Sequence, residues 1–67
     1  LFRSQYTGFK NLEILADMNG RISKADIRIV LKRVGLDPDM KKPVGKYSLG
    51  MRQRLGIAQA IMEDPLF

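Results

Sequence analysis

The chain contains no cysteine, no histidine and no tryptophan. Without cysteine and histidine it has no disulfide, no zinc finger, no cysteine nucleophile and no histidine base. No apolar run approaches the roughly 20 residues that span a bilayer as a helix, and the first residues lack the pattern of a signal peptide. We therefore expect a chain that is soluble or docks onto a partner, with no metal site and no complete catalytic site of its own.

Acidic residues are too few and too scattered for acid–base catalysis. There are 7 of them against 12 Lys and Arg, which gives a net charge of +5. They form close pairs only at Asp37/Asp39 and Glu63/Asp64, and neither pair has a base aligned with it. We expect both pairs to be solvated. The basic excess instead indicates a partner that is acidic or carries phosphate.

What the 67 residues do contain is the composition of a folded protein, 45% hydrophobic and 28% charged. A chain of this length makes one small domain that buries only roughly 60% of its unfolded surface, so its stability should be marginal. No segment keeps a strict period of two for long enough to be a strand. The sequence therefore predicts an all-α fold with about three helices.

Two of these helices have clear ends. The first covers residues 8–19, with Thr7 as its cap. The second begins at Ser23, which forms a capping box with Asp26, and stops at Gly35. Their apolar faces contain Phe9, Leu12, Leu15, Ala16, Ile27, Val30, Leu31 and Val34.

A loop over residues 36–45 leads to the third helix, which Ser48 caps and which runs through the segment Met51 to Met62. This helix is apolar nearly all round. Two short amphipathic helices cannot enclose it, so we expect further protein to cover it. The apolar residues 65–67 look like the beginning of a buried strand.

The approach to the third helix is basic, and no acid lies between Met40 and Met62. Basic side chains in the first two turns oppose the helix dipole, at about 0.3–1 kcal/mol each when they are exposed. An anion at the helix start relieves this conflict, because free N–H groups, the Ser48 hydroxyl and the bare backbone of Gly50 meet there. The basic residues of this stretch are Lys41, Lys42, Lys46, Arg52 and Arg54.

Simpler interpretations stay open for these features. Serine is among the commonest helix caps, and a charged run usually marks a solvated face. Phe2, Tyr6 and Phe9 are interpreted as core or interface contacts before a stacking platform for bases. The four methionines do not share one stripe, so we expect them to fill gaps in the core. Two alternatives for the whole chain are a small basic helical module that binds nucleic acid and a purely structural helical bundle.

Residues 47–54, followed by Leu55-Gly56-Ile57-Ala58 and later Asp64-Pro65, carry a family resemblance. They are similar to the signature region of ATP-binding cassette (ABC) ATPases, in which LSGGQ, a variable residue and Gln-Arg precede an Ala- and Leu-rich helix. The form found here resembles bacterial exporter ATPases for antibiotics, lantibiotics and bacitracin. Positions that match are Ser48, Gly50, Gln53 and Arg54, and positions that depart are Tyr47, Leu49 and Met51.

The resemblance implies that residues 1–67 are a fragment, the helical subdomain of an α/β P-loop NTPase, without Walker A or Walker B. It implies nucleotide binding in trans, in which the signature turn contacts the γ-phosphate of ATP held by the opposite subunit. The residues of that turn are Ser48, Leu49, Gly50 and Met51, supported by Tyr47, Arg52, Gln53 and Arg54.

For the full-length protein, the resemblance implies ATP with Mg as cofactor, a second ATP-binding subunit and a transmembrane permease as partners, and a peripheral position at the cytoplasmic face of the membrane. It implies no nucleic-acid partner. The fragment alone is expected to bind no cofactor and to be inactive. The exported substrate is selected by the permease and is not readable from this chain.

Overall fold

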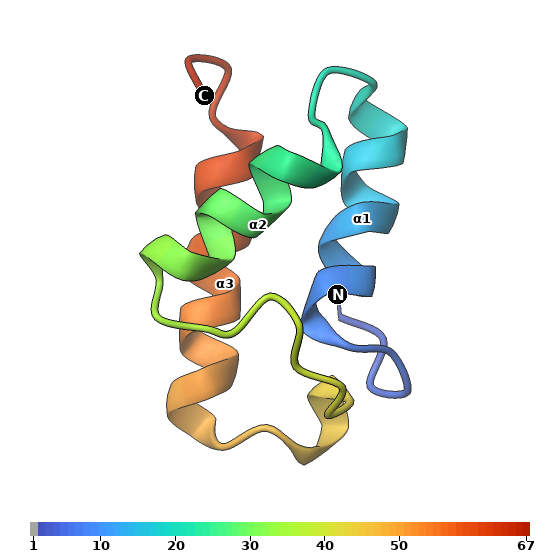
Figure 1. Cartoon of the computed structure of the whole chain (residues 1–67), viewed down its shortest axis with the longest axis vertical. Helices are drawn as coiled ribbons and strands as arrows, with labels where there is room; N and C mark the ends of the chain where they lie inside the picture. Colours follow the sequence, from blue (N-terminus) through green and yellow to red (C-terminus); the bar gives the residue numbers. More distant parts are fainter. Residues whose placement is uncertain (1) are drawn as a thin grey trace.

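The computed structural model describes residues 2–67 and consists of three α-helices joined by loops (Figure 1). These are α1 (Gly8–Asn19), α2 (Lys24–Arg33) and α3 (Leu49–Glu63), with one turn of 3-10 helix, η1 (Val44–Lys46), before α3. Over residues 2–67 there is no strand, only an isolated antiparallel bridge between Thr7 and Pro43. The all-α prediction is confirmed, although the loop over residues 36–45 is less irregular than expected.

The helix ends lie where their caps predict. The Thr7 hydroxyl accepts a hydrogen bond from Lys10 N at 3.1 Å, and α1 gives way to Gly20, whose φ of 79° is left-handed. At the start of α2, Ser23 and Asp26 form the expected capping box, with each side chain accepting from the other residue's backbone N–H. Such local side-chain bonds replace the hydrogen bonds that a helix end leaves unmade.

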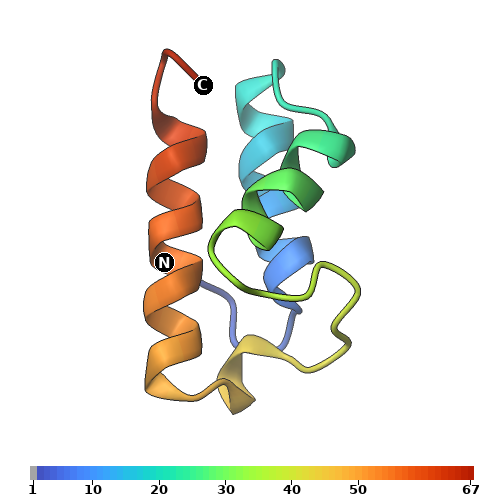
Figure 2. The same ribbon diagram turned by 60° about the vertical axis from the view of Figure 1, so that its left-hand side comes forward.

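The three helices pack around one small core. α2 crosses beside α1 and in front of α3 (Figure 1), and a turned view separates α3 from the α1–α2 pair (Figure 2). The start of α3, η1 and the loop before α1 lie together at one end of the molecule. None of the described helices is both long and apolar enough to cross a bilayer. The most completely buried side chains are Leu12, Ile27, Val30, Leu31, Leu55, Ala58 and Met62.

One side of α3 faces the core and the other does not. Leu55, Ala58 and Met62 are buried, as their spacing predicts, while Leu49 is 71% and Ile57 56% exposed within residues 2–67. An apolar helix with an uncovered side is what the sequence led us to expect. That further protein covers this side stays a prediction.

Two expectations about apolar residues are wrong in this structure. Residues 64–67 form a turn, not the beginning of a strand, because the Asp64 carboxylate accepts from Leu66 N at 2.9 Å and its carbonyl accepts from Phe67 N at 3.0 Å. Met18 does not fill a gap in the core, since it is 82% exposed. The other methionines follow the expectation: Met62 is fully buried, and Met40 and Met51 pack against the core.

Candidate functional site

The turn at Ser48 begins the longest helix of the chain, the 15-residue α3. Ser48 has extended backbone angles (φ −64°, ψ 165°), and its Oγ accepts a hydrogen bond from Met51 N at 3.2 Å. Its carbonyl accepts the first helical bond, from Arg52 N at 3.0 Å. Ser48 is thus an ordinary N-cap, as predicted. A hydroxyl that accepts one bond still has its own proton to donate.

Two backbone donors next to Ser48 have no hydrogen-bond partner in the part of the chain that the structure describes. The N–H groups of Leu49 and Gly50 have no acceptor within residues 2–67, and both residues are exposed. A Cβ added to Gly50 would meet no atom within 4 Å. Because free N–H groups and the helix dipole act together at a helix start, this turn offers the donors that an anion needs.

Gly50 has no structural reason to be glycine inside this chain. Glycine in a helix is less stable than alanine by about 0.5–1 kcal/mol, and here no neighbour forbids a side chain. Gly56, further along α3, shares this property. What distinguishes Gly50 is its position in the turn, where its own N–H and that of Leu49 are free.

Tyr47 precedes the turn and is 4% exposed. Its N–H donates to the Val44 carbonyl at 3.0 Å, and its own carbonyl accepts from Arg52 Nε and Nη2 at 3.3 and 3.2 Å. Its phenolic oxygen accepts from Gly8 N at 3.1 Å, across 39 residues of sequence. Tyr47 is therefore fixed through its amide, its carbonyl and its ring.

The basic residues near the turn do not all converge on it. Arg52 is turned onto the Tyr47 carbonyl. Arg54 Nη1 lies 3.8 Å from where a Cβ of Gly35 would stand, so its charge lies beside the C-terminal end of α2, where a cation suits the helix dipole. Gln53 is exposed. The adverse dipole inferred from the sequence is therefore relieved partly within the chain.

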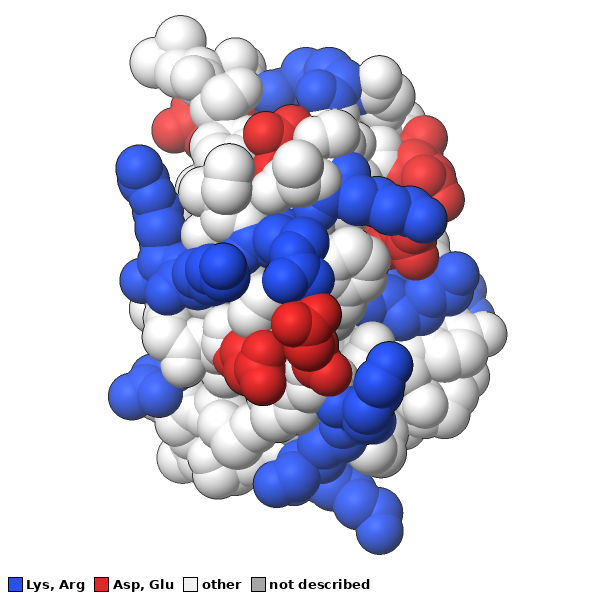
Figure 3. Space-filling model, in the orientation of Figure 1, with Lys and Arg blue, Asp and Glu red and all other residues white. Residues whose placement is uncertain are grey.

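On the face drawn in Figure 3, charge is spread and not gathered into one patch. Lys and Arg side chains lie on several parts of this face, with acidic side chains between them. This face of residues 2–67 therefore lacks the single basic stripe that the alternative, a nucleic-acid-binding module, would use. The same residues contain no group of three or more acidic, Cys or His side chains that could hold a metal ion.

Asp39, one of the four acids that the sequence led us to expect as solvated, forms an ion pair. Arg28 of α2 donates to the Asp39 carboxylate at 2.7 and 3.3 Å. This hydrogen bond, helped by the charge of Arg28, holds the pKa of Asp39 below its ordinary value. The Asp39 side chain is nevertheless 69% exposed. The pair ties the loop after α2 back onto that helix.

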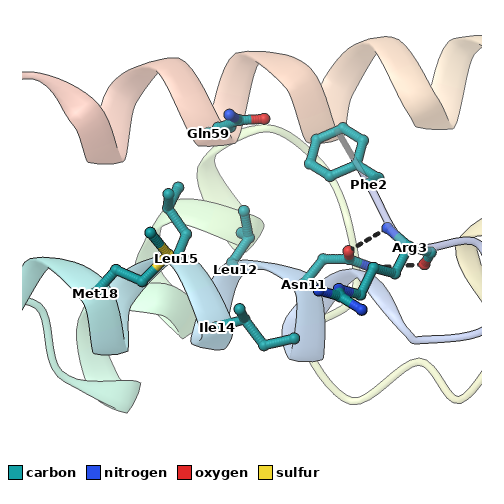
Figure 4. A pocket seen from close by; sticks show the side chains of 8 residues that line it. All are labelled: Phe2, Arg3, Asn11, Leu12, Ile14, Leu15, Met18 and Gln59. Carbon is teal, nitrogen blue, oxygen red and sulfur yellow. Dashed lines mark hydrogen bonds between the residues drawn. The ribbon is translucent and has the colours of Figure 1, made fainter.

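Sequence reasoning missed the role of Asn11 in α1. Its Oδ1 accepts from Arg3 N at 2.7 Å, and its Nδ2 donates to the carbonyls of Arg3 and Thr7 at 3.1 and 3.0 Å. Figure 4 shows these bonds to Arg3 beside a groove of about 220 Å³ between α1 and α3. The sequence does contain a signal for this role, which is an amide side chain in the first turn of a helix, one residue before the buried Leu12. A buried amide requires hydrogen-bond partners.

Comparison with known proteins gives one family and several relatives. The family model described as ABC transporter matches residues 2–67. The bacitracin transport ATP-binding protein of Enterococcus faecalis is 50% identical over 64 residues, and that of Bacillus licheniformis is 48% identical over 64. The lantibiotic transport ATP-binding protein of Streptococcus pyogenes is 39% identical over 59 residues. No solved structure matches the chain.

These alignments cover nearly all of the chain and a small part of each relative. They include 96% of the chain for both bacitracin proteins and 88% for the lantibiotic protein. The corresponding shares of the relatives are 21%, 21% and 25%. The chain therefore spans about a fifth of the length of the curated relatives it matches first.

Proposed function

Because this chain belongs to the ABC transporter family, we propose that residues 1–67 are the helical subdomain of a transporter's ATP-binding subunit, with the signature motif at residues 47–54. The proposal is supported by the all-α fold and by relatives whose names describe ATP-binding proteins. The observation that carries it is the turn at Ser48, with its two unpaired N–H groups at the start of α3.

In this function the turn binds the terminal phosphate of ATP held by the opposite subunit. The N–H groups of Leu49 and Gly50 and the hydroxyl of Ser48 donate to phosphate oxygens, and Gly50 leaves room for the close approach. Met51 acts indirectly, because its N–H is already bound to Ser48 Oγ and holds that hydroxyl in place. ATP with Mg supplies the phosphoryl group that is transferred.

The chemical contribution of this chain is electrostatic. Donors that are already in position stabilise charge as it develops on the transferred phosphoryl group, without the cost of reorganising solvent. The hydrogen bond from Arg52 to the Tyr47 carbonyl keeps the turn in position. Gln53 is exposed further along the helix, and Arg54 reaches toward the end of α2. No residue of this chain acts as the general base.

The complete protein would pair with a second ATP-binding subunit and dock onto a transmembrane permease at the cytoplasmic face of the membrane. Closure of the two ATP-binding subunits over nucleotide would then drive export. The names of the relatives refer to bacitracin and lantibiotic transport. We therefore propose a peptide antibiotic of this kind as the exported compound.

The proposal is tested by Ser48→Ala and Gly50→Asp in the complete ATPase. Loss of a donor to developing charge costs about 10²–10³-fold in turnover, so Ser48→Ala should slow hydrolysis without changing the affinity of the subunit's own ATP site. Gly50→Asp should slow it further. An acidic residue in the first turn favours the helix dipole, so this variant should lose activity without losing stability.

Ser23→Ala is the matched control. Ser23 caps α2 just as Ser48 caps α3, with its Oγ accepting from the N–H three residues later at the same 3.2 Å. Each substitution should cost about 1 kcal/mol of folding stability, but only Ser48→Ala should slow turnover. Equal turnover of the two variants would remove the role assigned to the Ser48 turn.

A further inference from the structure

The segment that leads into the Ser48 turn is attached to the segment that leads into α1. Val44 N donates to the Tyr6 carbonyl at 2.8 Å, and Gly45 N donates to the Ser4 carbonyl at 2.9 Å. Beside them, Thr7 and Pro43 form the isolated bridge. Two stretches that are about 40 residues apart in sequence therefore meet through backbone hydrogen bonds.

Tyr47 extends this attachment to the first turn of α1. Its hydroxyl accepts from the N–H of Gly8, the first residue of the helix, and the bond is buried. This N–H belongs to the group that a helix start leaves without an intrahelical partner. A phenylalanine or leucine at position 47 would fill the space but could not accept the bond.

The fit around the hydroxyl is tight. A Cβ added to Gly8 would lie 2.7 Å from the Tyr47 hydroxyl, 3.3 Å from Leu55 Cδ1 and 3.6 Å from Tyr47 Cε2. The first of these distances is too short for a Cβ carbon and an oxygen that are not bonded to each other, and the third is an ordinary contact. A side chain at position 8 is therefore incompatible with the observed position of the Tyr47 hydroxyl.

Asn11 fixes the other side of the junction. Its amide binds backbone groups of Arg3 and Thr7, which keeps the loop before α1 folded against the helix. The loop in turn presents the carbonyls of Ser4 and Tyr6 to the segment before the turn. A continuous set of hydrogen bonds thus connects the loop before α1, the first turn of α1 and Tyr47.

We propose that Tyr47 is a positioning residue for the phosphate-binding turn. The hydrogen bond between its hydroxyl and Gly8 N determines the position of Ser48 and of the free N–H groups relative to α1. The inference rests on the proposed function of the turn. Ser48 follows Tyr47 directly, so a movement of the ring is transmitted to the donors. A misplacement of about 1 Å can cost on the order of a hundredfold in rate.

The test uses three variants of the complete ATPase: Gly8→Ala, Tyr47→Phe and the two combined. Gly8→Ala should displace the ring and lower turnover at saturating ATP by about tenfold to a hundredfold. Tyr47→Phe removes the hydrogen bond to Gly8 N but keeps the packing of the ring, and should lower turnover several-fold. In the combined variant the methyl occupies the space that the hydroxyl leaves, so turnover should recover to within several-fold of the unmodified enzyme.

Turnover is expressed per folded enzyme, counted by ATP bound to the subunit's own site. A residue that only supports the fold would change the amount of folded enzyme and leave this quantity unchanged. Normal turnover of Tyr47→Phe, or a combined variant no faster than Gly8→Ala, overturns the inference. If Gly8→Ala does not fold, the turnover of Tyr47→Phe alone tests the inference. Turnover of this variant that is several-fold slower than that of the unmodified enzyme supports the proposal.

Ser48→Ala, measured alongside, separates this inference from the proposed function. If Ser48→Ala hydrolyses ATP normally, the function proposed for the turn fails and the positioning role fails with it. If Ser48→Ala is slow while Tyr47→Phe is normal, the turn acts as proposed and only the positioning role of Tyr47 is wrong.

Discussion

At the scale of single residues, the glycines at positions 45, 50 and 56 differ in what surrounds the place where a side chain would stand. A Cβ on Gly45 would lie 3.1 Å from both the Cβ and the carbonyl oxygen of Ser4, whereas Gly50 and Gly56 face open space. Gly45 therefore permits the close approach of two backbones inside the chain. Gly50 permits an approach from outside.

We expect Gly45→Ala to destabilise the fold by about 1–3 kcal/mol, because the backbone of Ser4 cannot move aside as a flexible side chain does. Gly56→Ala is the matched control. With nothing near its Cβ, it should stabilise α3 by about 0.5–1 kcal/mol. Urea unfolding followed by circular dichroism measures both. A neutral Gly45→Ala would mean that the two segments are not held as closely as the structure has them.

At the scale of elements, the ends of the helices depend on residues nearby in the sequence, whereas the segments between the helices depend on residues that are distant in it. Thr7, Ser23 and Ser48 lie within three residues of the N–H groups they cap, so α1, α2 and α3 were predicted close to their observed ends. The turn η1 was not predicted. It is attached through Val44 and Gly45 to carbonyls that are distant in sequence, and no local pattern reveals such partners.

The loop after α2 is attached through the Arg28–Asp39 pair, and this attachment should depend on pH. Arg28 lowers the pKa of Asp39, so the pair stabilises the fold above the ordinary aspartate value of about 3.9. That contribution is lost as the pH falls through the lowered pKa of Asp39. We therefore expect the stability advantage over Asp39→Asn to be present at neutral pH and to shrink as the pH falls below about 3.9.

Thermal unfolding of both proteins across this pH range measures the advantage. Asp37→Asn is a suitable control, because the hydrogen bonds of Arg28 go to Asp39, whereas the Asp37 carboxylate accepts from the backbone N–H of Asp39. An advantage that stayed constant down to the lowest pH would contradict the lowered pKa.

At the scale of the whole molecule, the proposed function makes this chain one part of a larger site. In that proposal the donors at Ser48, Leu49 and Gly50 stabilise charge on a phosphate that another group holds and cleaves, and the chain has no histidine or cysteine to begin the reaction. We expect the 67-residue chain alone to release no phosphate from ATP above the rate of the solution reaction. A phosphate-release assay with the complete subunit as positive control measures this. Turnover that is abolished by Gly50→Asp in the isolated chain would contradict it.

Family membership was predictable from the sequence because the matching residues lie close together at one helix start. Ser48, Gly50, Gln53 and Arg54 stand at fixed spacing along one helix start, and the match to the ABC transporter family confirms the resemblance they carry. The sequence alone gives no reason for the departures at Tyr47, Leu49 and Met51. For Tyr47 the structure supplies one, because its hydroxyl has a partner on α1.

The sequence by itself determined the three helices and the cap at Ser48, since each depends on residue types and on neighbours within one or two turns. Only the tertiary structure decided where the turn stands. The Tyr47 hydroxyl meets Gly8 across 39 residues, Arg54 lies beside the end of α2, and Asn11 binds the loop before its own helix. Such contacts exist only once the helices have packed, because packing brings together groups that the order of the residues keeps apart.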